Sequence, residues 1–288
     1  MQFSFKTKVL NFVRNIFKIP FLESLLVKKT KGKSVNTFWC KVMPNYYQYK
    51  HPSWRSIVRD NIKLHVDISD WMGYCYYFAF QNELGALFDL CNEGYNVVDI
   101  GANTGWTVLK LSQKTKTGKV IGFEPDTYNY SQCKKNIELN KNISNITVLP
   151  FGLGENNMNA QIEVRAKANR GGNRIATKKM NDVETIQIKK LDEVKEVRSL
   201  SKIDLIKIDV EGYELKVLKG AETILLTFKP TLFIEVDNNN LSEQGDSASL
   251  LITYLNHLGY NKIINAETNT IVTPAIDFTN CHYDIIAK

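Results

Sequence analysis

The sequence predicts an α/β fold in which a mostly parallel sheet is covered by helices on both faces. From Val97 onward, short β-rich runs alternate with helical patterns, which is typical of such a sheet. A hydrophobic content of 43% is sufficient for a sizeable core. Because 288 residues exceed a typical single domain, we expect an N-terminal extension over residues 1–60 and a main domain over residues 61–288.

Seven strands are expected in the main domain. Five are predicted at Val97–Ile100, Val120–Phe123, Ile146–Leu149, Leu205–Ile208 and 231–236, and two more near 262–264 and 283–287. Helices fall between them. Tyr130, Cys133 and Ile137 share one helical face, and the 0, 3, 4, 7 spacing of Leu251, Tyr254, Leu255 and Leu258 predicts a helix that ends at Gly259.

Two segments depart from this alternation. Residues 35–95 are aromatic and irregular, with a half-buried strand expected at 62–68, and we expect them to form a small cap beside the ligand-binding edge. Residues 155–203 are too long for a simple loop, and alternating runs at 162–164 and 186–188 suggest a hairpin insertion. Its basic tip is either a mobile lid that attracts an anionic ligand or a solvated loop; it contains Arg165, Lys167, Arg170, Gly171, Gly172, Arg174, Lys178 and Lys179.

The positive charge is concentrated in residues 1–34. Eight basic residues and one acid, Glu23, account there for the whole net charge of +7. The remaining body is neutral, which argues against a nucleic-acid-binding core. The apolar runs are too short to span a bilayer, and no signal-peptide core is evident. The segment is either an amphipathic helix attracted to anionic lipid, making a peripheral membrane contact, or a helix docked on its own domain with a solvated basic face. We expect the docked helix.

Cysteines and histidines suggest neither a metal centre nor a hydrolase. The five cysteines are widely spaced and odd in number, and the four histidines are scattered. This pattern favours reduced, mostly buried thiols in a cytoplasmic protein, and neither a structural zinc nor a Ser or Cys nucleophile with a His base is indicated.

A nucleotide-type cofactor site is predicted where the strand Val97–Ile100 enters a glycine-bearing turn. Gly101 and Gly105 allow a tight turn and a close ligand approach, and Glu124, at the end of the next strand, suits a ribose diol. Asn103 replaces the second glycine of a dinucleotide fingerprint, and Trp106 and Thr107 replace the Lys-Ser/Thr pair of a phosphate loop.

The negative charge of Asp99 would repel a phosphate. A cofactor with a ribose, an adenine and a cationic amino-acid tail but no phosphate fits better, and S-adenosylmethionine is such a molecule.

Acidic residues cluster after the strand Leu205–Ile208. Asp209 lies at the carboxyl end of a strand, where ligands of open α/β sheets bind. Glu211 and Glu214 would face the same way if a helix begins at Gly212. Three roles stay open for this cluster: a general base, the ligands of a divalent cation, or acids that complement a helix dipole.

These residues resemble the FkbM-type S-adenosylmethionine-dependent methyltransferases. The resemblance covers roughly residues 64–288. Its blocks are 98–105 (Val-Asp-Ile-Gly-Ala-Asn-Thr-Gly), 123–125 (Phe-Glu-Pro) and 206–214 (Ile-Lys-Ile-Asp-Val-Glu-Gly-Tyr-Glu), with support from 191–193 and 233–235.

The resemblance implies a class I methyltransferase (Rossmann-like) fold, a seven-stranded sheet with an antiparallel last strand, and O-methylation of a sugar, glycan or small-molecule hydroxyl. The residues implied around the amino-acid end of the cofactor are Asp99, Gly101, Ala102, Asn103 and Gly105. Glu124 would hold the ribose with Asp126 nearby, and the residues facing the acceptor would be Asp209, Glu211 and Glu235.

Two other functions remain as alternatives. An RNA ribose methyltransferase would use a Lys/Asp/Glu constellation like Lys207, Asp209 and Glu235, but we expect Lys207 to alternate away from Asp209 along the strand. A non-catalytic module would keep the cofactor site as a scaffold. DNA bases are disfavoured because no Pro-Pro-aromatic run follows the fourth strand.

Overall fold

The structure is a computed structural model that describes residues 4–33, 36–79, 84–165, 169–181 and 183–288. The chain forms two compact units. The first contains residues 1–85 and 165–172, and the second contains residues 86–164 and 173–288. The first unit therefore extends past residue 60, where the sequence suggested a boundary.

The second unit is built on a seven-stranded sheet with the order β12-β13-β11-β10-β3-β4-β5. Its strands are β3 (Val97–Ile100), β4 (Val120–Phe123), β5 (Ile146–Leu149), β10 (Leu205–Ile208), β11 (Thr231–Asp237), β12 (Ile263–Asn265) and β13 (His282–Ala287). All neighbours from β11 to β5 are parallel, whereas β13 is antiparallel to both β11 and β12. All seven predicted strands are confirmed.

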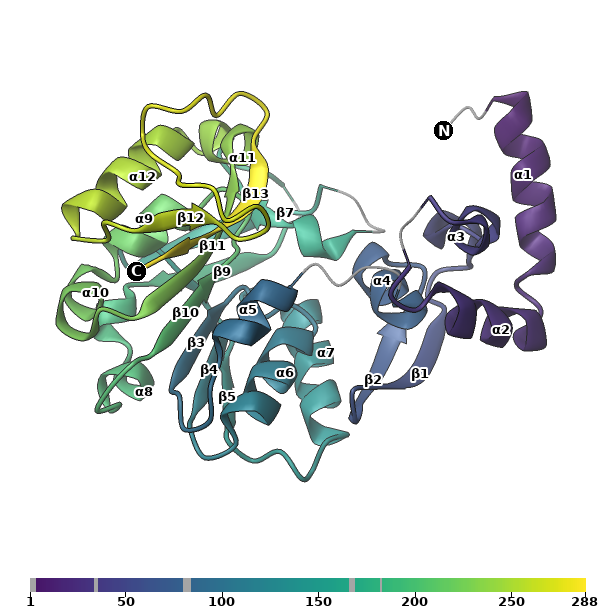
Figure 1. The fold of residues 1–288 in the computed structure, drawn as a ribbon, viewed down its shortest axis with the longest axis horizontal. Coiled ribbons are helices and arrows are strands. Elements are labelled where there is room, and N and C mark those ends of the chain that lie inside the picture. Colours follow the sequence, from purple (N-terminus) through teal and green to yellow (C-terminus); the bar gives the residue numbers. More distant parts are fainter. Residues whose placement is uncertain (1–3, 34–35, 80–83, 166–168, 182) are drawn as a thin grey trace. The chain divides into compact units, whose positions relative to one another are not determined.

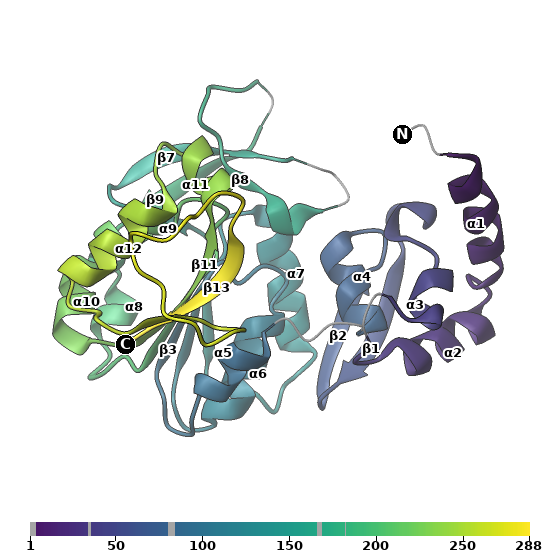
Figure 2. The same ribbon diagram turned by 45° about the horizontal axis from the view of Figure 1, so that its top comes forward.

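Helices cover both faces of this sheet (Figures 1 and 2). One face carries α5 (Gly85–Leu90), α6 (Trp106–Thr115) and α7 (Thr127–Glu138), and the other carries α8 (Lys195–Arg198), α9 (Glu214–Lys219), α10 (Glu222–Phe228), α11 (Asn238–Glu243) and α12 (Ala248–His257). Ser247 caps α12 by accepting from the Leu250 N–H, and the helix gives way at Leu258 to Gly259 in the left-handed region, as predicted.

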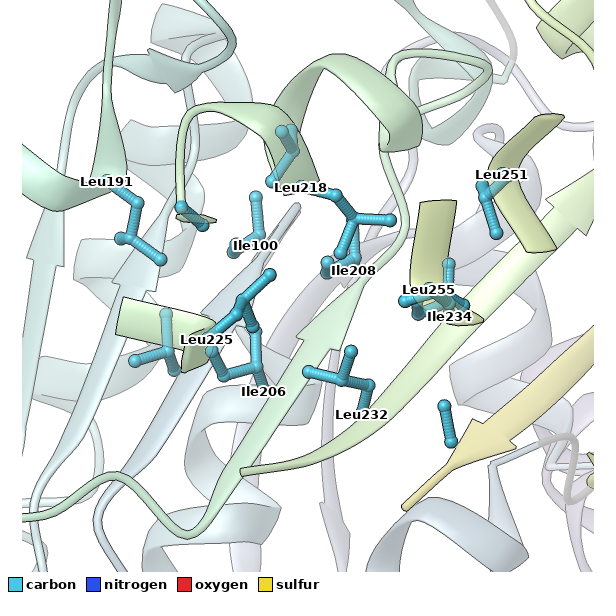
Figure 3. Packing of buried hydrophobic residues seen from close by; sticks show 14 of the residues in the cluster. Ile100, Leu191, Ile206, Ile208, Leu218, Leu225, Leu232, Ile234, Leu251 and Leu255 are labelled. Atoms are coloured by element: carbon cyan, nitrogen blue, oxygen red, sulfur yellow. The ribbon is translucent and has the colours of Figure 1, made fainter. Parts of the chain in front are cut away.

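The main core lies between the sheet and the second group of helices. Figure 3 shows Ile100, Ile206, Ile208, Leu232 and Ile234 of the strands beneath Leu218, Leu225, Leu251 and Leu255 of the helices. These side chains are almost fully buried. Because every residue of β3, β4 and β10 is buried, each of these strands reads in the sequence as a continuous apolar run with few polar interruptions.

The insertion at 155–203 contains the predicted hairpin strands. β7 (Met158–Glu163) pairs antiparallel with β9 (Thr185–Lys189), and a small sheet with the order β6-β9-β7-β8 also includes β6 (Gly152–Leu153) and β8 (Arg174–Ile175). A 3-10 turn, Leu191–Glu193, follows. Part of the basic tip, residues 166–168, lies outside the described residues.

The first unit combines helices with one hairpin. Its helices are α1 (Phe5–Ile16), α2 (Pro20–Thr30), α3 (Phe38–Val42) and α4 (Trp71–Phe78), with 3-10 turns at Tyr46–Gln48 and Arg170–Gly172; the hairpin pairs β1 (Trp54–Arg59) with β2 (Ile62–Asp67). The strand expected at 62–68 is thus confirmed, whereas its role as a cap stays a prediction.

Helix α1 contacts its own unit through polar groups. No residue of α1 is buried, and its large apolar side chains are exposed. The helix contacts α3 and the turn Tyr46–Gln48 through polar side chains instead. The helix therefore lies against its own unit with Lys6 and Lys8 exposed, and its apolar face is exposed as well.

No helix among the described residues is long and apolar enough to cross a membrane. All five cysteines are free thiols, and four of them are buried, as expected.

Candidate functional site

The turn after β3 packs closely against the backbone that follows β10. Gly101 has φ +88°, and a Cβ there would lie 1.9 Å from the backbone oxygen of Asp209. Gly105 has φ +95°, and its Cβ would lie 2.9 Å from the Cys133 sulfur. Both glycines thus form a tight turn, as predicted, and they are also required by contacts within the protein, which the sequence did not indicate. Asn136 of α7 also donates to the Thr104 carbonyl (2.9 Å) and fixes the turn.

Glu124 joins this turn to the end of β4. Its carboxylate accepts from the Asn103 N–H (2.8 Å) and from the Asp126 N–H (2.9 Å). Burial raises the pKa of Glu124 to about 8, although these hydrogen bonds oppose the shift. Asp126 caps α7 through the Asn129 N–H, and its other oxygen accepts from the Asn173 amide (2.9 Å).

Asp99 lies beneath the turn and has no exposed surface. It accepts a hydrogen bond from the Thr107 hydroxyl, and its Oδ1 lies 3.4 Å from the Lys207 ammonium. Asp99 therefore supports the turn through its buried contacts with Thr107 and Lys207.

Lys207 connects the two predicted parts of the site. Its side chain is 2% exposed, and its Nζ donates to the Gly101 carbonyl (2.8 Å) and lies 3.1 Å from Asp209 Oδ2. Burial lowers the pKa of Lys207, but the carboxylates of Asp209 and Asp99 outweigh that effect and raise it overall. One buried cation thus holds Asp99, the glycine turn and Asp209 together.

The expectation that Lys207 points away from Asp209 is wrong. Side chains alternate along a strand, so residues two apart share a face. The register also pairs Lys207 directly with Asp99 on β3. Since Lys207 is buried among its oxygen partners, it has no free donor for an acceptor molecule.

A row of carboxylates crosses the carboxyl edge of the sheet. Asp209 follows β10, Glu235 lies on β11, and the register pairs Glu235 with Asp284 on β13. Asp209, Glu211 and Glu235 each place an oxygen within 4.8 Å of the other two. The three residues predicted to face the acceptor are therefore brought together, from positions 26 residues apart in sequence.

Glu211 and Glu214 do not share a helix face. The helix begins at Glu214 rather than at Gly212, and Glu211 has φ +54° in the preceding turn. The Glu214 carboxylate folds back to accept from the N–H groups of Val210 and Gly212, so it stabilises the turn from within. Glu211 instead accepts from the Asn240 amide (2.8 Å).

Two carboxyl groups of this row, Glu235 and Asp284, have raised pKa values. Burial, followed by the charges of Asp209, Glu211, Glu214 and Asp284, raises the pKa of Glu235 well above its usual range. Burial and Asp209 raise the pKa of Asp284 to about 7. Such groups hold a proton near neutrality, which is a property of acid–base sites. Asp209 is more accessible than Glu235, since 39% of the Asp209 side chain is exposed.

The basic tip of the insertion offers fewer free charges than the sequence suggested. Arg174 lies on β8 and forms ion pairs with Glu163 (2.7 Å) and Glu243. The tip as a lid stays a prediction.

Sequence reasoning missed several residues of this site. Lys207 was set aside, and the roles of Thr107, Asn136, Asn240 and Asp284 were not foreseen. Lys207 did carry a signal, because a lysine inside the apolar run Leu205–Ile208 needs a buried partner. The other four residues come close to the site only through the tertiary fold, which local sequence patterns do not contain.

The residues at this edge fit S-adenosylmethionine better than a phosphate-bearing cofactor. Glu124 offers carboxylate oxygens that accept hydrogen bonds, which ribose hydroxyls can donate. The negative charges of Asp126 and Asp209 would repel a diphosphate, and Lys207 is engaged internally.

The strand order, the antiparallel β13 and the acidic carboxyl edge define a class I methyltransferase fold. Residues 99–262, more than half of the chain, match the methyltransferase FkbM domain model. The chain belongs to this family.

Three curated relatives show local similarity. "Methyltransferase 1" of Beauveria bassiana is 29% identical over 145 residues, which cover 44% of this chain and 58% of that protein. "Methyltransferase sdnD" of Sordaria araneosa is 29% identical over 166 residues, covering 47% and 64%. "Hexuronic acid methyltransferase AglP" of Haloferax volcanii is 27% identical over 145 residues, covering 50% and 57%. The matches thus span less than two thirds of each relative.

Among solved structures, methyltransferase FkbM from Methylobacillus flagellatus superposes with a TM-score of 0.45 at 22% identity, over 68% of this chain and 44% of that chain.

Proposed function

We propose that this protein transfers the methyl group of S-adenosylmethionine to a hydroxyl of a sugar, a glycan or a small molecule. The observation that carries the proposal is the convergence of Asp209, Glu211 and Glu235 within 4.8 Å, at the sheet edge that also holds the glycine turn. Family membership supports methyl transfer as the reaction.

The residues proposed to hold the cofactor are Asp99, Gly101, Ala102, Asn103, Gly105, Glu124 and Asp126. Glu124 would exchange its contacts with backbone N–H groups for ribose hydroxyls, with Asp126 beside it. Asp99 would act indirectly, because it is fully buried and supports the turn through Lys207 and Thr107. S-adenosylmethionine supplies an activated methyl group on a sulfonium when it is bound.

The carboxylate row is proposed to remove the proton of the acceptor hydroxyl. Asp209 is exposed enough to reach an acceptor, and Lys207 beside it keeps its position. The oxygen of the acceptor forms a bond to the methyl carbon as the carbon–sulfur bond breaks, and the hydroxyl proton passes to a carboxylate. Alignment of these atoms supplies much of the rate.

An acceptor hydroxyl on a sugar is supported by one relative, whose name states that it methylates hexuronic acid. An anionic acceptor would meet like charges at Asp209 and Glu211. A neutral acceptor would meet no such repulsion at this edge of the sheet.

The same three carboxylates are spaced to hold a divalent cation, which prefers oxygen ligands. A bound cation would offset the repulsion of an anionic acceptor. Metal dependence is therefore expected with anionic acceptors and not with neutral ones.

Calorimetric titration with S-adenosylmethionine, NAD and ATP tests the cofactor. We expect saturable binding of S-adenosylmethionine alone, weakened about tenfold or more by Glu124→Gln, because an amide cannot accept from both ribose hydroxyls equally well. Glu93→Gln, at an exposed carboxylate, is the matched control. Binding of NAD instead would overturn the assignment.

Methyl transfer to panels of neutral and uronic-acid sugars tests the reaction. Asp209→Asn should lower kcat about 100-fold or more while S-adenosylmethionine still binds, and wild-type activity should rise with pH through neutrality as the row loses protons. Parallel assays with a metal chelator test whether transfer to each acceptor depends on a divalent cation. Full activity of Asp209→Asn would contradict its role as the base, and wild-type binding without transfer to any acceptor would favour a non-catalytic module.

A further inference from the structure

The first helix of the protein has its polar side turned inward and its apolar side turned outward. Asn11 and Arg14 face the protein: the Asn11 carbonyl accepts from the Gln48 amide (3.0 Å), and the Arg14 guanidinium donates to the Lys41 carbonyl (3.0 Å). Lys18, one turn after Arg14, donates to the Gln48 carbonyl. Polar contacts thus attach α1 to its own unit.

The opposite side of α1 carries an apolar stripe, formed by Phe5, Val9, Phe12 and Ile16. The spacing of four, three and four residues aligns them along one face of a helix. Phe5 is 81% exposed and Phe12 is 74% exposed, and Val9 and Ile16 are about half exposed. A stripe of this kind is normally buried, so its exposure indicates a partner.

Lysines flank the stripe. At 100° per residue, Lys6 and Lys8 fall on its two sides, and both are exposed. Exposed lysines also follow at the end of α2 and after it, at positions 28, 29, 31 and 33. Lys6 and Lys8 thus place positive charges at the border of an apolar surface, where long side chains reach the polar region above a lipid layer.

The one acid of residues 1–34 does not reduce this charge at the surface. Glu23 is 3% exposed, and its carboxylate is bound by the Arg55 guanidinium (2.7 and 3.2 Å) and the Tyr77 hydroxyl (3.0 Å). The charged side chains exposed on residues 4–33 are therefore all basic.

We propose that the stripe of α1 and its flanking lysines bind the surface of a membrane that contains anionic lipid. Apolar side chains of an interfacial helix enter the boundary of the acyl chains, and each lysine gains from the negative surface potential. A second copy of this chain is a poorer partner, because pairing two such faces would bring lysines together. The proposal goes beyond the catalytic function and is independent of it.

Vesicle flotation of the full chain tests the proposal. We expect flotation with vesicles of phosphatidylcholine and phosphatidylglycerol, little with phosphatidylcholine alone, and a decrease as salt rises. The double variant Phe5→Ser/Phe12→Ser should weaken binding about tenfold or more, because it removes the two largest apolar groups of the stripe.

The matched control is Leu250→Ser/Ile271→Ser, which removes two exposed apolar side chains from the second unit. Circular dichroism checks that both variants fold, which is expected because all four side chains are exposed. The control variant should bind vesicles like the wild type.

Three outcomes would overturn the proposal: failure of the wild type to float with anionic vesicles, equal binding by the stripe variant, or sedimentation showing a dimer that depends on Phe5 and Phe12 without vesicle binding. None of these readouts involves S-adenosylmethionine, so failure here leaves the catalytic proposal intact.

Discussion

A single lysine in the fourth parallel strand controls the electrostatics of the candidate site. Lys207 lies between Asp99, which has no exposed surface, and Asp209, which is partly exposed. A buried carboxylate without a cation is costly, whereas a satisfied pair is tolerated. Lys207 therefore allows an acid to lie beneath the glycine turn.

We predict that Lys207→Met destabilises the protein by about 3–5 kcal/mol, because it leaves Asp99 buried without its ion partner. Asp99→Asn in the Lys207→Met background should recover part of this loss. Urea unfolding of the two single variants and the double variant measures the coupling. Strictly additive effects in this cycle would show that Lys207 and Asp99 do not depend on each other.

The turn that joins β3 to α6 leaves no room for a side chain at Gly101. At Gly101 the left-handed backbone and the nearby Asp209 backbone act together, whereas Gly245, after α11, has φ +81° and open space around a Cβ. Substitutions at these two glycines therefore distinguish the cost of backbone strain from the cost of steric overlap.

We predict that Gly245→Ala costs about 1–2 kcal/mol, the strain of a left-handed residue. Gly101→Ala should cost clearly more and weaken binding of S-adenosylmethionine, because the strands must separate to admit the methyl group. Thermal unfolding and calorimetry measure both effects. Equal losses for the two variants would mean that the contact with Asp209 yields easily.

Elements defined by local patterns were predicted well. β3, β4, β5 and β10 match their expected ends, because each is a buried β-rich run between polar turns. The sequence pattern of α1 showed two faces but not which one lies against the protein. The start of α9 was misplaced because Glu214 folds back onto the turn that precedes it.

Several residues of the candidate site were predicted, but the contacts between them were not. Asp209, Glu211 and Glu235 were identified as a group through the family resemblance. Asp284 was not, because only the insertion of β13 beside β11 brings it to Glu235. Distances between residues on different strands depend on strand order, which local spacing does not contain.

At the scale of the whole molecule, buried carboxylic acids make stability depend on pH. Burial raises the pKa of Glu124 to about 8 and that of Glu214 to about 7. A folded-state pKa above the unfolded value means that the protonated form is favoured by folding. The contribution is complete below the unfolded pKa and is lost as the pH rises through the folded one.

We predict that the free energy of unfolding falls between about pH 5 and pH 8, with a share of about 3 kcal/mol at most from Glu214. Glu214→Gln should flatten this decrease, and Glu93→Gln, at an exposed site, should keep the wild-type dependence. Urea titrations across this range provide the measurement. Stability that rises with pH over this interval would contradict the direction given for these groups.

The position of β13 has a consequence for synthesis. This strand, His282–Ala287, lies between β11 and β12 and is the last of the seven to leave the ribosome. Until it emerges, β12 has no partner in the sheet and β11 keeps an open edge. Asp284 arrives with β13, so a nascent chain acquires its complete acidic row only after the other six strands have been translated. A ribosome stalled before residue 282 leaves a sheet that is unfinished and exposed to wrong pairing.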